Sequence, residues 1–167
     1  MAATLEEAKA YLRIEDATED ALIARLIATA TQLCEQFIGQ ALVARTVTET
    51  VAATGDWRRL RTTPVRAITK VEGLAVTGAP IVLPVDGYAI DIDANGDGWV
   101  RVRGVGRAAV TLEAGMAADV AGLPEPLRQG VLRLVAHLHA HRDEADEEGP
   151  PAAVVALWRP WRRMRLR

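Results

Sequence analysis

The stretch EDALIARLIATATQLCEQFIG, residues 19–39, decides the fold of this chain of 167 residues. Its apolar residues recur at spacings of three and four, which is the period of one face of an α-helix. Glu19 and Asp20 suit the positive end of a helix dipole, and Gly39 is placed to end the helix as a C-terminal cap. The pattern therefore predicts a helix over 19–38 with one face in a core.

Helices are also predicted on both sides of this segment. Thr4 followed by Glu7 is a capping-box pair, so a short helix should run over 5–13 and form a helical hairpin with the next one. Pro124 and Pro126 suit the start of a third helix, which an apolar stripe extends over 125–142. AAVVALW, residues 152–158, predicts a last short helical segment.

Between these helices, over 41–115, the apolar period changes to two and turn residues recur. The candidate strands are ARTVTETV, VRAITKVE, APIVLP, GYAIDI, WVRVRG and AAVTLEAG. We expect an α+β fold: a helical bundle core, made of the N-terminal hairpin and the long C-terminal helix, with a small antiparallel β-sheet inserted in the middle and an extended C-terminal arm. A single domain should span 1–142, with an acidic linker over 143–151 and the short helix and basic arm over 152–167.

Composition excludes several classes of protein. The net charge of −2 gives no global field that would attract nucleic acid or a membrane surface. No window approaches eighteen consecutive apolar residues, so no membrane partner is expected. The one cysteine, Cys34, lies in a helical apolar pattern, which favours a buried structural thiol over a nucleophile.

The segment DIDANGDGWV, residues 91–100, places Asp91, Asp93 and Asn95 where a calcium loop has its first ligands. The twelfth position, which needs a bidentate carboxylate, is Val102. The flanking segments alternate like strands, so a hairpin turn is favoured and no metal is expected.

The histidines of HLHAH, His137, His139 and His141, include a pair four apart, which is a spacing used by zinc ligands on helices. Leu138 stands where a metalloprotease has its glutamate, so packing at a helix end is favoured over a metal site. The sequence contains no serine, so a serine nucleophile is excluded. No catalytic residue and no cofactor are therefore predicted.

Charge is uneven near the C-terminus. The run DEADEE, residues 143–148, is almost wholly acidic, whereas WRPWRRMRLR, residues 158–167, is basic and contains two tryptophans. Tryptophan and arginine are enriched at interface hot spots, and a basic segment interrupted by proline at a chain end has little reason to fold onto its own core. We therefore expect an interaction arm, with a protein groove favoured over nucleic acid as its partner.

The order of these segments resembles the head-tail connector, or adaptor, proteins of long-tailed phages and phage-derived gene transfer agents. The resemblance rests on LEEAKAYLRIED, the helix that follows it, the β-rich middle, LPEPLRQGVLRLVAHLHAHRDE and the terminal VVALWRPWRRMRLR. It covers essentially the whole chain and includes no catalytic signature.

The resemblance implies a structural protein of the particle neck, assembled in the bacterial cytoplasm. Such proteins form a ring, usually of twelve subunits, beneath the portal, and a stopper or tail completion protein binds on the other side. DNA passes through the lumen without specific binding.

By the same resemblance the C-terminal segment docks into the portal. The residues that would form this portal-binding arm are Trp158, Arg159, Pro160, Trp161, Arg162, Arg163 and Arg165. Trp161 stands where the family often has tyrosine. The residues that could meet arginines of a neighbouring subunit are Asp143, Glu144, Asp146, Glu147 and Glu148.

Two other functions stay open at this point. The first is a small nucleic-acid-binding protein that uses the arginine and tryptophan tail. The second is a metal-dependent enzyme or sensor built on the histidines or the Asp91 loop.

Overall fold

The computed structural model describes residues 1–141 and 149–163, and these residues form two compact units. The first unit contains Met1–Val43 and the described part of Ala117–Arg167, and the second is Ala44–Met116. The acidic run over 143–148 and Arg165 lie outside the described residues.

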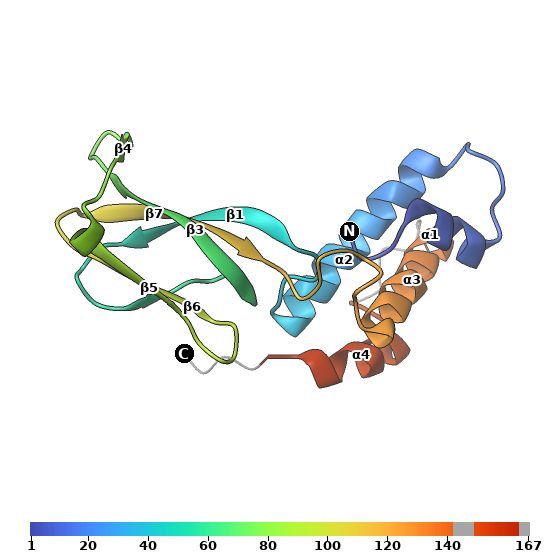
Figure 1. The fold of residues 1–167 in the computed structure, drawn as a ribbon. Coiled ribbons are helices and arrows are strands. Elements are labelled where there is room, and N and C mark those ends of the chain that lie inside the picture. The colour runs from blue at the N-terminus through green and yellow to red at the C-terminus, as the bar shows by residue number, and fades with distance from the viewer. Residues whose placement is uncertain (142–148, 164–167) are drawn as a thin grey trace. The chain divides into compact units, whose positions relative to one another are not determined.

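The first unit is helical (Figure 1). Its elements are α1 (Leu5–Leu12), α2 (Asp20–Ile38), α3 (Glu125–Ala140) and α4 (Ala152–Trp158), which leads directly into the 3-10 turn η2 (Arg159–Trp161). Helix α2 packs along α3, and α1 contacts both. The predicted helices are thus present, and α3 ends at Ala140, slightly before the expected position.

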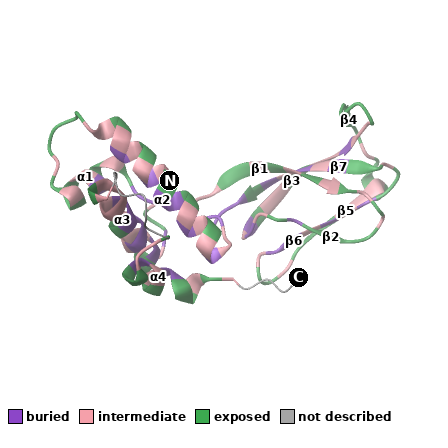
Figure 2. Cartoon of the chain, turned by 180° about the vertical axis from the view of Figure 1, so that it is seen from behind, coloured by how far each residue is buried: buried purple, intermediate pink, exposed green. Residues whose placement is uncertain are grey.

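One face of each long helix is buried (Figure 2). Helix α2 buries Ile23, Ile27, Cys34 and Ile38, which repeat at helical spacing. The buried residues of α3 are Leu127, Gly130, Val131, Leu134 and Val135. Apolar burial of this kind stabilises by about 25 cal/mol per Å².

The N-terminus is part of the same core. Ala2 is fully buried, and its N–H donates a 3.0 Å hydrogen bond to Thr31 Oγ1. The Thr31 hydroxyl in turn donates to the Ile27 carbonyl at 2.7 Å, so this buried polar group is satisfied on both sides.

The capping box predicted at the start of α1 is confirmed. Glu7 N–H donates to Thr4 Oγ1 at 3.1 Å, and Thr4 N–H donates to Glu7 Oε2 at 2.8 Å.

The C-terminal helix closes the helical core with a tryptophan. The Trp158 side chain has no exposed surface, and its ring centroid lies 6.0 Å from that of Phe37. Its indole covers Gly130: a Cβ added there would lie 2.8 Å from Trp158 Cδ1 and 3.0 Å from Cε2. Only glycine at 130 leaves room for this ring.

The predicted short helix over 152–158 is present, but the expectation that an extended arm begins at Trp158 is wrong for residues 158–161. Residues 152–161 form a helix followed by a 3-10 turn, and Val154 and Trp158, one turn apart, face the core. The physical reason is the area of an indole, whose burial outweighs the basic character of the residues after it.

The second unit consists of seven strands in two antiparallel sheets. The first sheet has the order β1 (Arg45–Ala52), β7 (Arg107–Ala114), β3 (Val65–Leu74) and β4 (Pro80–Ile81). The second has the order β2 (Arg58–Arg59), β6 (Gly98–Val102) and β5 (Tyr88–Ile92). A one-turn 3-10 helix, η1 (Val85–Gly87), precedes β5.

The sequence predicted a small inserted sheet, but the β-rich region forms two sheets and has a core of its own. Alternate residues of β6 and β7 are buried, as the period of two predicted. The fully or nearly fully buried members of this core are Leu60, Val65, Val100, Val102, Ala108, Val110, Leu112 and Ala114. Strand β2 escaped the sequence pattern because it has only two residues, both exposed arginines.

None of the helices in the described chain is long and apolar enough to cross a membrane.

The contact between Gly130 and Trp158 can be tested by a substitution, because it reverses the sign of the expected change in stability. In an ordinary helix interior Gly→Ala stabilises by up to about 1 kcal/mol. Here Gly130→Ala should instead destabilise by about 1–3 kcal/mol, because the new methyl group overpacks against the indole. Urea unfolding followed by tryptophan fluorescence measures the change. Gly106→Ala, which meets open space, is the control, and equal effects of the two variants would contradict the packing argument.

A second test concerns Glu7. The Thr4 backbone N–H and the neighbouring Arg128 guanidinium, outweighing partial burial, lower the pKa of this carboxyl. A lowered folded-state pKa stabilises the protein above the ordinary value near 4.3 and loses this contribution as the pH falls through the folded value. Glu7→Gln keeps the cap but removes the charge.

We therefore expect Glu7→Gln to lower the free energy of unfolding by about 0.5–1 kcal/mol at pH 7. At an acidic pH below the lowered folded-state pKa of Glu7, where the carboxyl is protonated in both states, the difference from the parent chain should shrink towards zero. Urea titrations at both pH values measure it. A difference that is the same at both would show that the charge is not responsible.

Candidate functional site

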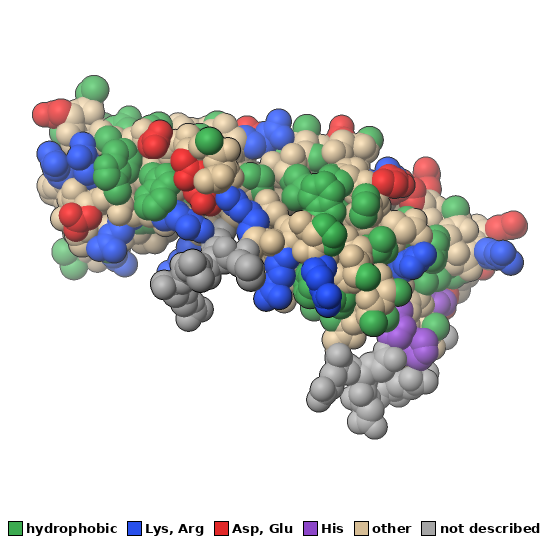
Figure 3. Space-filling view, turned by 90° about the horizontal axis from the view of Figure 1, so that it is seen from below, with side chains coloured by type: hydrophobic (Ala, Val, Ile, Leu, Met, Phe, Trp, Pro, Cys, Tyr) green, Lys and Arg blue, Asp and Glu red, His purple; other side chains and the backbone are tan. Residues whose placement is uncertain are grey.

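The residues around the end of α4 form an apolar groove. Its volume is about 450 Å³, and its lining consists of Pro126 at the start of α3 together with Ala156, Leu157, Pro160 and Trp161. The groove lies between segments that are thirty residues apart in the sequence, so no local motif could indicate it. Arg159 and Arg162 are exposed next to it, and Figure 3 shows hydrophobic and basic side chains adjoining on this face.

The segment after Trp158 is held against the end of α2. Arg163 N–H donates to the Ile38 carbonyl at 2.9 Å, and Gln40 Nε2 donates to the Trp161 carbonyl at 2.8 Å. The Arg162 guanidinium lies 5.5 Å from the centroid of the Phe37 ring, within cation–π range. These contacts fix the backbone of 161–163 while the Arg159 and Arg162 side chains stay exposed.

The predicted arm thus separates into an anchor and a surface. Trp158 belongs to the core and cannot contact a partner without leaving it. Arg159, Pro160 and Arg162 are exposed, and Trp161 is half-buried at the groove. Of the other predicted site residues, Arg165 and the acidic residues Asp143, Glu144, Asp146, Glu147 and Glu148 lie outside the described residues.

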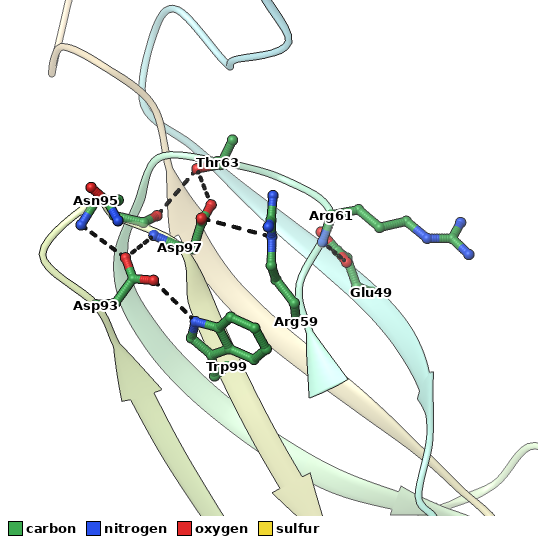
Figure 4. Close-up of polar contacts among 9 residues, drawn as sticks. Glu49, Arg59, Arg61, Thr63, Asp93, Asn95, Asp97 and Trp99 are labelled. Atoms are coloured by element: carbon green, nitrogen blue, oxygen red, sulfur yellow. Dashed lines mark hydrogen bonds and ion pairs between the residues drawn. The ribbon is translucent and has the colours of Figure 1, made fainter. Parts of the chain in front are cut away.

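The segment that resembles a calcium loop is a hairpin turn between β5 and β6 (Figure 4). Asp93 Oδ1 accepts hydrogen bonds from the N–H groups of Asn95 and Asp97, at 2.8 and 3.0 Å, and Asp93 Oδ2 accepts from the Trp99 indole at 3.2 Å. Asp97 Oδ1 accepts from the Thr63 hydroxyl at 3.1 Å. The carboxylates hold the turn together, and the described residues include no group of three acidic, histidine or cysteine side chains fit to bind a metal.

The histidines lie at the C-terminal end of α3 and appear purple in Figure 3. His139 Nε2 lies 2.9 Å from Glu19 Oε2, and the rings of His137 and His141 stack at 4.4 Å. The contact between His139 and Glu19 connects the end of α3 to the residue that precedes α2. This geometry gives the histidines a packing role.

Cys34 is fully buried in α2, and burial raises the pKa of its thiol far above the usual value. A thiol held protonated in this way is a poor nucleophile. It is a core residue, as the apolar pattern predicted.

One exposed cluster was missed in the sequence. Arg58 and Arg59 form strand β2, and Trp57 and Arg61 lie next to it in the sequence. The Arg101 guanidinium lies 5.2 Å from the centroid of the Trp57 ring. Trp57 is 42 % exposed. The signal was present in WRRLR, residues 57–61, which combines tryptophan and arginine as the basic tail does, but this segment lies between two predicted strands and was assigned no role.

The sequence was also compared with known proteins. The family model described as head completion protein matches residues 2–147. The chain belongs to the head completion protein family. This is a family of structural proteins and not of enzymes, and it confirms the resemblance at the level of the family. A comparison with curated proteins finds no match.

Solved structures with the same fold come from gene transfer agent (GTA) particles. A chain in the neck of an empty GTA particle, determined with C6 symmetry, has a TM-score of 0.77 and 23 % identity, with 99 % of this chain and 91 % of that chain covered. Chains in the virion of a native particle and in a native neck with C12 symmetry each have a TM-score of 0.76, 24 % identity and the same coverage. At this identity the likeness establishes the fold.

The hairpin turn gives a prediction about calcium. Since the Asp93 carboxylate already accepts three hydrogen bonds from its own turn, millimolar calcium should leave the melting temperature unchanged within about 1 °C. A bound ligand would raise the stability by an amount that grows with its concentration. Differential scanning calorimetry with calcium and with a chelator measures this, and a rise that increases with calcium would contradict the structural reading of the turn.

Proposed function

We propose that this protein is a neck adaptor of a phage or gene transfer agent particle, where it forms a ring beneath the portal and joins head to tail. The observation that carries the proposal is the fold: it matches chains of GTA necks over 99 % of its length, and the chain belongs to the head completion protein family. Those necks were determined with C6 and C12 symmetry, which supports a ring of twelve subunits here.

The exposed residues of the C-terminal segment are the proposed portal contact. Trp161 and Pro160 supply apolar surface at the groove, and Arg159 and Arg162 supply charge at its side. This combination of an exposed aromatic side chain with arginines is typical of binding hot spots. Trp158 fixes the segment to the helical unit, and Arg163 and Arg165 are the further basic residues of the proposed contact.

A ring also explains why the chain needs several interaction surfaces. Subunits in a closed ring make heterologous contacts, in which one patch meets a different patch of the neighbour. The tail-proximal side then binds a stopper or tail completion protein. The DNA in the lumen passes without a specific grip, which agrees with the small net charge of −2.

The test is binding to the portal protein encoded beside this gene. Deleting residues 158–167 would be an ambiguous change, because it removes the buried Trp158 from the core. We therefore expect the point variants Trp161→Ala and Arg159→Glu/Arg162→Glu to weaken binding about thirtyfold or more, as hot-spot substitutions do, while the circular dichroism spectrum stays that of the parent. Pull-down and surface plasmon resonance give the affinities.

Arg25→Glu/Arg133→Glu is the matched control, since both arginines are exposed on the helical unit and neither lines the groove. Equal portal binding by all variants would overturn the docking role of the segment. No portal binding by the parent chain, together with steeply salt-dependent DNA binding that the Trp161 and Arg159/Arg162 variants lose, would favour the nucleic-acid alternative.

A further inference from the structure

A second groove lies within the β-sheet unit. Its volume is about 210 Å³, and it is lined by residues 49–52 of β1 and by Arg58, Arg59 and Arg61. Strands β1 and β2 are each the last strand of their sheet, so one side of each backbone has no strand partner in the described chain. Such open edges are where proteins pair with other segments.

The arginines of the groove are available for an acidic partner. Arg61 is exposed, and its guanidinium, which points away from the sheets in Figure 4, makes no ion pair with the described residues. Arg58 donates to the Thr54 hydroxyl at 3.1 Å, which uses one of the five N–H donors of its guanidinium. Arg59 Nε lies 3.7 Å from Asp97 Oδ2.

The carboxylates nearby are already engaged in the fold. Glu49 accepts the backbone N–H groups of Arg61 and Thr62, at 2.8 and 2.7 Å, through its two oxygens. Asp56 accepts the Thr54 hydroxyl at 3.1 Å. These contacts shape the groove wall, and the stacked pair of Trp57 and Arg101 adds an aromatic surface of the hot-spot type.

The partner with the complementary charge is present in the sequence itself. Residues 143–148, DEADEE, carry five carboxylates in six positions. We propose that this acidic run of one subunit binds the arginine groove of a second copy of the chain, at Arg58, Arg59 and Arg61. The inference rests on the proposed ring, in which each subunit presents two different surfaces to its two neighbours.

Charge pairing of this kind also favours protein over DNA as the occupant. A duplex in the lumen must move, whereas a neighbour's carboxylates are fixed partners. Glu49 is the carboxylate in the lining of the groove, and its two oxygens already accept the backbone N–H groups of Arg61 and Thr62, so it leaves the arginine side chains of the groove to an incoming acidic segment.

The first experiment separates the groove from the portal. The probe is a fluorescent peptide of residues 142–150, and the receptor is the full chain with its own run neutralised by Asp143→Asn, Glu144→Gln, Asp146→Asn, Glu147→Gln and Glu148→Gln. We expect anisotropy to report binding at low salt that weakens about tenfold on Arg58→Ala/Arg61→Ala, and that falls as the Debye length shortens from about 30 Å at 0.01 M to about 10 Å at 0.1 M salt. Arg25→Ala/Arg133→Ala should bind the peptide like the receptor.

The second experiment decides between neighbouring copies and a contact within one chain. Thr50 lines the groove and Ala145 lies within the acidic run, so Thr50→Cys/Ala145→Cys keeps every charge, and Cys34 is buried. Mild oxidation should give disulfide-linked dimers and larger multimers. Val82→Cys/Ala145→Cys, with the cysteine on an exposed loop outside the groove, should not.

Several results would overturn the proposal. In the first experiment, these are a peptide that does not bind at low salt, or that binds independently of Arg58 and Arg61. In the second, they are a disulfide that forms within single chains, or disulfide-linked multimers that form equally well with the Val82 control. A different outcome would assign the groove to nucleic acid instead. In that case the peptide does not bind, double-stranded DNA does bind, and the DNA binding is lost when Arg58 and Arg61 are replaced. Portal binding is read separately, so failure of the groove and failure of the adaptor role are distinguishable.

Discussion

The burial of Trp158 against Gly130 is the contact on which the helical unit depends. A glycine in the middle of α3 is unfavourable for a helix on its own, and the indole that covers it restores the lost packing. Because Trp158 is the last residue of α4, the same contact determines where the chain goes next. The C-terminal segment then follows the end of α2, and the apolar groove forms beside it.

The polar groups of both units serve mainly to stabilise turns and helix ends. Glu7 caps α1 and pairs with Arg128 of α3, and His139 connects α3 to Glu19. In the β-sheet unit Asp93 and Asp97 hold the hairpin turn. Residues that resemble catalytic or metal-binding groups in the sequence are thereby assigned to the fold. This is consistent with a family whose function is structural.

The surfaces that remain exposed are of the kind that assembly requires. Arginine and tryptophan lie together in the described part of the C-terminal segment and at β2. Exposed arginine and aromatic side chains that lie together are expected at interfaces with other proteins. Several distinct surfaces are what the proposed ring, with its neighbours, portal and tail protein, would require.

The sequence by itself determined the helices, the capping box, the strand alternation, the buried Cys34 and the hairpin at Asp93, because each depends on neighbours within a few residues. It also supplied the family resemblance through the order of its segments. Only the tertiary structure decided that Trp158 is core and not surface, that the β-rich region has a core of its own, and that Arg58, Arg59 and Arg61 line one groove. Each of these depends on contacts between residues that are distant in the sequence. Gly130 makes space for the indole of Trp158. The two sheets share one core, and the end of β1 lines the same groove as β2. Local periodicity contains no information about such pairs, so the chemistry of the surfaces could be read from the sequence but their positions could not.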